Sequence, residues 1–162
     1  MKSSQLETPV LLCAFNRPDK ARQVFEMIRK ARPKRFYLAV DGPAHDGQKA
    51  EVGFCQGLVD LVDWSCEVHT RFAASNQGCG QGMKNAIDWF LEEEEMGIIL
   101  EDDCLPSESF FPFCEELLLR YRDSSEVGSI LGNNFGYEGP KERSYEFGPL
   151  FHAWGWATWR GA

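Results

Sequence analysis

The chain repeats one pattern, in which a short apolar run is followed by a segment with apolar residues at helical spacing. Strand-like runs cover residues 9–15, 36–40, 67–72, 97–100 and 127–131. Helical stripes lie between them, such as Ala21, Val24, Phe25 and Ile28 after the first run. Alternation of this kind predicts an α/β fold with a mostly parallel sheet covered by helices on both faces.

Length and charge limit the protein to a few classes. A chain of 162 residues suits one domain, and the stop directly after the Trp-rich run at residues 151–159 predicts that residues 1–162 are incomplete at the C-terminus. The formal net charge of −8 argues against nucleic-acid binding, because phosphates would be repelled. Without an export signal or a transmembrane segment, we expect a soluble, cytoplasmic protein whose six cysteines stay reduced.

Three carboxylates follow the apolar run at residues 97–100, namely Glu101, Asp102 and Asp103. Such a cluster is costly at the end of a buried strand unless a positive charge lies among them. Hard divalent cations prefer oxygen ligands, so the cluster predicts a metal site facing a phosphate-bearing substrate. A solvated acidic turn is the alternative. The acidic run at residues 92–95 has no strand support and predicts a solvent-exposed helix face.

Ligands of open parallel sheets bind at the carboxyl ends of the strands, which predicts that several polar residues lie close together. The residues at predicted strand ends are Asn16, Arg17, Asp41, Arg71, Glu101, Asp102 and Asp103. Arg17 and Arg71 have the fork geometry that binds diphosphate, although either alone is often a surface cation. Asp41 could accept hydrogen bonds from a base or ribose, or begin an ordinary Asp-Gly-Pro turn.

Other nucleotide motifs are weak or missing. The glycines at residues 78–82 are misplaced for a dinucleotide fingerprint, and no Walker loop, Gly-x-Ser-x-Gly elbow or His-Glu-x-x-His is present. Residues 136–148 have the composition of a loop. Trp154 and Trp156 lie in an aromatic segment that could stack on a sugar or belong to the core.

Four segments together resemble glycosyltransferases of the GT-A type, which belong to the nucleotide-diphospho-sugar transferase superfamily. Within that superfamily, their order and spacing resemble the bacterial proteins related to N-acetylglucosaminyltransferase I. The four segments are Leu-Leu-Cys-Ala-Phe-Asn-Arg-Pro at residues 11–18, Ala-Val-Asp-Gly-Pro at 39–43, Leu-Glu-Asp-Asp-Cys-Leu-Pro-Ser at 100–107 with Phe110 and Phe111, and Trp-Gly-Trp-Ala-Thr-Trp at 154–159. The resemblance implies a Rossmann-like three-layer sandwich.

The same resemblance implies roles for single residues. Asp103 would bind manganese (Mn2+, or Mg2+) in a Glu-Asp-Asp variant of the family's Asp-x-Asp motif. Arg17 would contact the diphosphate and Asp41 the base, while Glu101 and Asp102 would lie near the ribose and donor sugar. Asn16, Arg71, Trp154 and Trp156 are assigned to the same donor site. The catalytic base of inverting relatives follows the Trp-Gly-Trp region, so we expect it beyond Ala162.

The expected function is metal-assisted transfer of a sugar from a nucleotide-diphosphate sugar donor to an acceptor hydroxyl on a glycan or another molecule. Inversion at the anomeric carbon is favoured by the resemblance. Two alternatives remain at this point: a donor-binding fragment without catalytic activity, and a metal-dependent nucleotidyltransferase or phosphatase. The donor base, the donor sugar, the acceptor and the oligomeric state do not follow from the sequence.

Overall fold

The computed structural model describes residues 5–133 and 144–162, so part of the predicted loop at residues 136–148 lies outside the described residues. The described elements are β1 (Val10–Ala14), α1 (Pro18–Ala31), β2 (Arg35–Val40), η1 (Asp46–Gln48), α2 (Lys49–Gln56), η2 (Gly57–Leu61), β3 (Glu67–Phe72), α3 (Cys79–Glu93), β4 (Met96–Glu101), α4 (Phe110–Arg120), β5 (Ile130–Leu131) and β6 (Trp156–Trp159). Elements η1 and η2 are short 3-10 helices.

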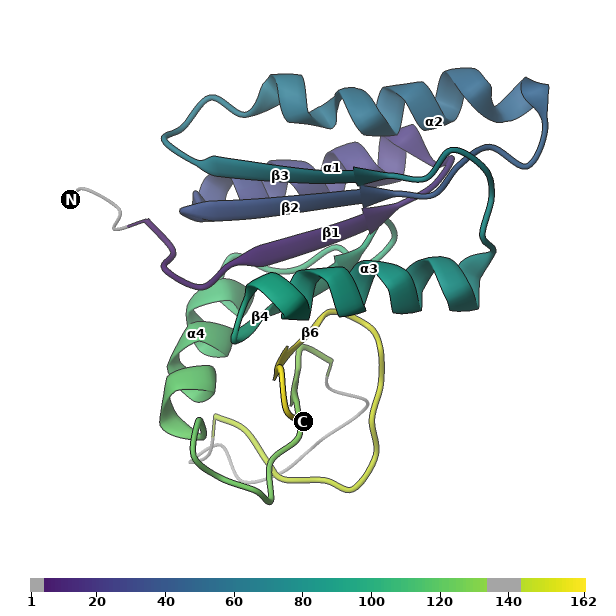
Figure 1. Cartoon of the computed structure of the whole chain (residues 1–162). Coiled ribbons are helices and arrows are strands. Elements are labelled where there is room, and N and C mark those ends of the chain that lie inside the picture. Colours follow the sequence, from purple (N-terminus) through teal and green to yellow (C-terminus); the bar gives the residue numbers. More distant parts are fainter. Residues whose placement is uncertain (1–4, 134–143) are drawn as a thin grey trace.

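The strands form one sheet in the order β3-β2-β1-β4-β6-β5 (Figure 1). Parallel pairing joins β1 to β2, β1 to β4 and β2 to β3, whereas β6 runs antiparallel to both β4 and β5. The predicted α/β fold with a mostly parallel sheet is therefore confirmed.

Helices cover both faces of this sheet, as the strand side chains require. Alternate residues of β1 point to opposite faces: Val10 and Leu12 join a large apolar cluster with α1, α2 and α4, whereas Leu11 and Cys13 join a smaller one with α3. Figure 1 shows α1 and α2 on one side of the sheet and α3 on the other. Burial on both faces explains why β1, β2 and β4 appear in the sequence as continuous apolar runs.

The C-terminal part of the sheet differs from the expectation. Only Ile130 and Leu131 of the predicted strand at residues 127–131 pair, and they pair with β6. Strand β6 was not predicted; it forms because residues 156–159 pair with Met96–Ile99 of β4, far away in the sequence. Helix α3 begins at Cys79, so two of the glycines at residues 78–82 lie in its first turn.

The expectation of a solvent-exposed acidic face at residues 92–95 is wrong for Glu94. Its side chain is buried and accepts hydrogen bonds from Arg35 Nε at 2.6 Å and from the Tyr37 hydroxyl at 2.9 Å. The backbone N–H of Glu94 also closes the last turn of α3 by donating to the carbonyl of Phe90. Glu94 thus fastens the end of α3 to β2.

The helices that the structure describes are too short or too polar to cross a lipid bilayer.

Candidate functional site

The order in which the chain adds strands to the sheet reverses between β1 and β4. From β1 the chain moves through α1 to β2 and then to β3, and it returns to the other side of β1 only with β4. The connections leaving the carboxyl ends of β1 and β4 therefore diverge and leave a crevice between them. Helix α1 starts at Pro18, which suits the first helical position because proline has no N–H to satisfy. This start places Arg17 at the mouth of the crevice.

Arg17 bridges the two aspartates that follow β4. Its Nη2 lies 2.6 Å from Asp102 Oδ1, and its Nη1 donates to Asp103 Oδ2 at 2.8 Å. The other oxygen of Asp102, Oδ2, accepts the backbone N–H of Phe15 at 3.3 Å. Among the described residues Asp102 Oδ1 has no well-aligned hydrogen bond, so its contact with Arg17 is mainly ionic. The positive charge that the carboxylate cluster requires is thus supplied at least in part by the chain itself.

The three carboxylates lie in different surroundings. Asp102 is 3% exposed, and burial raises the pKa of its carboxyl against the opposing effect of Arg17. Glu101 is half-buried; burial raises its pKa, and the charges of Asp103 and Asp102 raise it further. Asp103 is the accessible member, with 40% of its side chain exposed. An incoming ligand can therefore reach Asp103 most easily.

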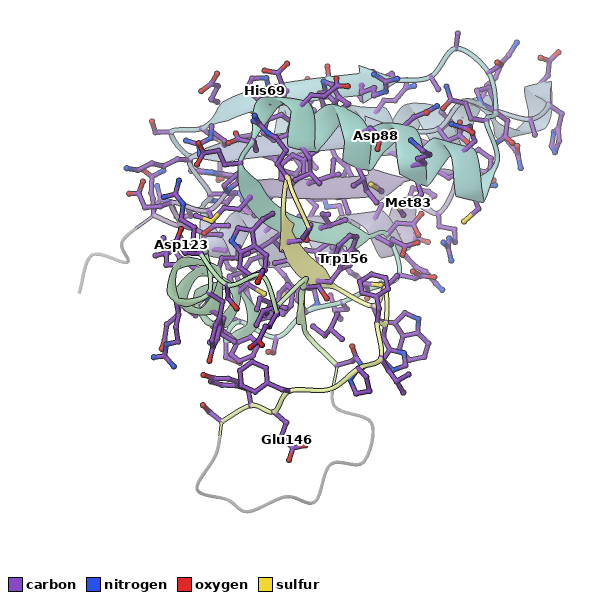
Figure 2. All side chains as sticks on the ribbon, turned by 60° about the horizontal axis from the view of Figure 1, so that its bottom comes forward. His69, Met83, Asp88, Asp123, Glu146 and Trp156 are labelled. Atoms are coloured by element: carbon purple, nitrogen blue, oxygen red, sulfur yellow. The ribbon has the colours of Figure 1, made fainter. Side chains whose placement is uncertain are left out.

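A cavity of about 280 Å³ lies beside this bridge, over the carboxyl ends of β1 and β2. Its floor is apolar and includes Cys13, Ala39 and Ala86, and its rim carries Arg17 and Asp102. Met83, which also lines the cavity, lies near the start of α3 in Figure 2. An apolar floor with a few polar groups at the rim is typical of small-molecule sites.

Asp41 lines the cavity but uses its carboxylate to hold the loop after β3. Its oxygens accept the backbone N–H groups of Gly42 at 2.8 Å and Gln77 at 2.9 Å, and the Asn76 side-chain amide at 3.0 Å. A Cβ on Gly42 would lie 2.4 Å from the backbone carbon of Ser75, so only glycine fits this close approach. Asp41 therefore shapes the cavity wall.

Arg71 also lines the cavity, near the end of β3. Its side chain is exposed, and within residues 5–133 and 144–162 it has neither an ion pair nor a hydrogen bond. A cation at a cavity rim without an internal counter-charge suits an anionic ligand.

Asp103 borders a second cavity of about 660 Å³, together with Lys20, Phe110 and Trp154. Trp154 is 63% exposed. Trp156 instead packs from β6 against the α3-side cluster and the ring of Phe151, and it borders neither cavity (Figure 2). Asn16 lies in the turn before α1 and borders neither cavity.

The structure therefore brings most of the predicted site residues together. Those at the first cavity or its rim are Arg17, Asp41, Arg71, Glu101 and Asp102; those at the second are Asp103 and Trp154. The residues that sequence reasoning missed are Asn76 and Gln77, which join Asp41 to the cavity wall. The signal for them was the Asn-Gln-Gly loop directly before a helix.

A divalent cation at this site would need ligands in addition to the side chains that the structure describes. Among the residues that the structure places, no three His, Cys, Asp or Glu side chains converge as a ready-made metal cage. Asp103 alone offers an accessible carboxylate, and Mg2+-type ions are commonly held by one or two carboxylates together with substrate phosphates and water. Asp103 thus fits the role of a single protein ligand, provided that its bond to Arg17 can open.

Replacing Glu101 by Gln should raise the melting temperature at pH 7, because the change removes a half-buried charge repelled by two neighbours. A carboxyl whose pKa is raised in the folded state stabilises the fold fully only at pH values below its unfolded pKa, about 4.3. The gain of Glu101→Gln over the wild type should therefore shrink as the pH falls toward that value and be largely gone below it. Thermal unfolding at several pH values measures this, with the exposed Glu92→Gln as control.

An unchanged melting temperature in Glu101→Gln would show that electrostatic repulsion by the neighbouring carboxylates does not destabilise Glu101.

A scan against protein-family models found no match for this chain, and a search of curated proteins found no similar sequence.

Proposed function

We propose that this chain is the donor-binding domain of a GT-A type glycosyltransferase, which moves a sugar from a nucleotide-diphosphate sugar to an acceptor hydroxyl with the help of Mn2+ or Mg2+. The observation that carries the proposal is the Arg17 bridge to Asp102 and Asp103, located between two cavities at the point where the strand order reverses. The resemblance of the Glu-Asp-Asp and Trp-Gly-Trp segments to that family supports it further.

The chemistry of the cavity walls suggests how a donor would lie. The first cavity has an apolar floor for a nucleoside, and Arg71 at its rim can pair with a phosphate oxygen. Arg17 can do the same if its bond to Asp103 opens. The sugar would then extend toward the second cavity, where the exposed Trp154 ring offers a stacking surface.

In the proposed reaction the acceptor oxygen attacks the anomeric carbon, and the bond from that carbon to the diphosphate oxygen breaks. The electron pair leaves with the nucleoside diphosphate, and the hydroxyl proton leaves to a base. A bound cation would supply positive charge to the departing diphosphate. Asp103 would hold the cation, and the guanidinium groups of Arg17 and Arg71 would add fixed positive charge to the same leaving group.

Titration calorimetry with uridine, guanosine and thymidine diphosphates, each with and without Mn2+, tests the donor site. We expect one of them to bind in a metal-dependent way, and Asp103→Ala to weaken that binding at least about tenfold because the cation loses its protein ligand. Asp123→Ala, an exposed carboxylate outside both cavities, is the matched control and should bind as the wild type does.

Equal binding in Asp103→Ala would remove the metal assignment, and absence of binding by all three diphosphates would remove the donor site itself. Donor hydrolysis in the presence of Mn2+ separates catalysis from binding. A chain that binds the diphosphate but does not hydrolyse its sugar donor would match the alternative of a donor-binding domain without activity.

A further inference from the structure

Strand β3 forms one edge of the sheet, and its outer side is open. It pairs only with β2, and among the described residues no strand or bridge lies on its other side. Five of its six side chains are exposed, including Val68 and Phe72 at 37% and 41%. Figure 1 shows β3 at the outer edge of the sheet. Sheet edges usually carry protection, because an open edge can pair with another chain.

Three of the usual protective features, namely proline, lysine and a β-bulge, are missing from β3. The strand runs Glu-Val-His-Thr-Arg-Phe without proline or lysine, and its register with β2 is continuous over all six residues, without a bulge. The opposite edge of the sheet, β5, is only two residues long. Of the two edges, the longer β3 therefore favours pairing.

The hydrogen bonds between β3 and β2 determine which backbone groups of β3 point to the open edge of the sheet. Glu67 donates its N–H to the carbonyl of Lys34, and Ala73 donates to Val40, so the odd-numbered residues bond to β2. In a parallel pair the N–H and C=O groups of one residue point to the same neighbour. The backbone groups of Val68, Thr70 and Phe72 therefore point to the open side.

The charges of β3 are complementary to themselves when two copies pair in an antiparallel way. If His69 lies on the two-fold axis, Glu67 lies opposite Arg71 of the second copy, and Arg71 opposite Glu67. Val68 and Thr70 then form the hydrogen-bonded pairs, as their outward backbone groups require. Moving the axis to Thr70 would place His69 opposite Arg71 and lose both ion pairs. The outward backbone groups can form hydrogen bonds in both registers, so charge selects the register with His69 on the axis.

The lack of an ion-pair partner for Arg71 among the described residues is consistent with this pairing. Arg71 forms no ion pair within the described part of the chain, while the exposed carboxylate of Glu67, on the same face of the strand, lies 3.1 Å from His69 Nε2 and close enough to Arg35 to raise the pKa of that guanidinium. Charged cross-strand pairs stabilise antiparallel sheets. Two copies joined in this way would supply each Arg71 with a carboxylate.

We propose that the chain forms a two-fold symmetric dimer in which two β3 strands pair in antiparallel orientation, with His69 at the axis and Glu67 opposite Arg71 of the second copy. Each edge is used once, so the assembly closes at two copies. Because Arg71 lines the first cavity, the second copy places Glu67 close to the rim of that cavity. The dimer does not depend on the proposed donor binding; in the dimer Glu67 of the second copy and a donor phosphate would compete for the same Arg71 guanidinium.

Sedimentation equilibrium of the whole chain tests the dimer through charge reversal. Glu67→Arg and Arg71→Glu each place like charges opposite one another, and each should raise the dimer dissociation constant about tenfold or more. The double variant Glu67→Arg/Arg71→Glu restores opposite charges and should return the constant close to the wild-type value. Glu126→Arg, the same charge change on an exposed residue between α4 and β5, should leave it unchanged.

A second variant tests the backbone contribution without any change of charge. Thr70→Pro removes an N–H that points away from β2, so it should abolish the dimer and retain the fold, as circular dichroism can verify. A monomeric wild type, or a dimer that all of these variants leave intact, would overturn the proposal.

Discussion

Replacing Arg17 by Met should lower the free energy of unfolding by about 2–3 kcal/mol at pH 7, because the buried Asp102 carboxylate loses the charge that balances it. The cost stays below that of a fully buried ion pair because Arg17 is itself 46% exposed, so water already screens part of the interaction. Met keeps the length and apolar character of the Arg17 stem. Urea denaturation measures the effect.

The loss should depend on pH in a defined direction. Burial already raises the pKa of Asp102, and Arg17 opposes that effect, so Arg17→Met should raise the pKa further. A raised pKa means that the protonated carboxyl is favoured in the folded state. The destabilisation should therefore be largest at neutral pH and shrink as the pH falls toward about 4, where Asp102 is protonated.

Two variants make this result specific to the bridge. Arg22→Met removes an exposed i,i+4 ion pair with Glu26 on α1 and should cost less than about 0.5 kcal/mol. The double variant Arg17→Met/Asp102→Asn removes the uncompensated charge and should recover most of the lost stability. If Arg17→Met costs no more than Arg22→Met at every pH, Asp102 does not depend on Arg17.

The inner strands of the sheet could be predicted from the sequence because burial on both faces requires apolar residues at every position. Strands β1, β2 and β4 are buried along nearly their whole length, so each appears as a continuous apolar run. Strand β6 has no such continuous apolar run in the sequence. Its tryptophans suit a ligand surface or a core equally well, and only the distant pairing with Met96–Ile99 decides between strand and loop.

The sequence could group the residues of the candidate site, but it could not predict the contacts among them. The rule that ligands bind at the carboxyl ends of parallel strands correctly grouped Arg17 with Asp102 and Asp103. That Arg17 itself neutralises the two aspartates depends on side-chain directions across 85 and 86 positions of sequence. The hydrogen bonds of Asp41 likewise depend on the path of the loop after β3, which no local pattern determines.

Glu94 also shows that a local sequence pattern does not predict the surroundings of a single charged side chain. A run of four glutamates at a helix end predicts a solvated face, since each residue alone would prefer water. The helix turn directs only one of the four toward β2, where Arg35 and Tyr37 can satisfy it. Tertiary packing, absent from the local pattern, makes the difference between Glu94 and its neighbours.

Replacing Glu94 by Ala should therefore lower the free energy of unfolding by about 2–3 kcal/mol, because the buried Tyr37 hydroxyl loses its acceptor and Arg35 loses its counter-charge. The neighbouring Glu92→Ala is exposed and should change stability by no more than about 0.5 kcal/mol. Urea denaturation of both variants gives the comparison.

A double-mutant cycle with Tyr37→Phe separates the phenol contact from the rest. Tyr37→Phe removes the donor, so the further cost of Glu94→Ala in that background should fall by about 1 kcal/mol, the usual net value of such a hydrogen bond. The remaining cost then belongs to Arg35 and to the packing of α3 against β2. Equal costs of Glu94→Ala in both backgrounds would mean that Tyr37 and Glu94 act independently, and that the ion pair with Arg35 alone holds the end of the helix.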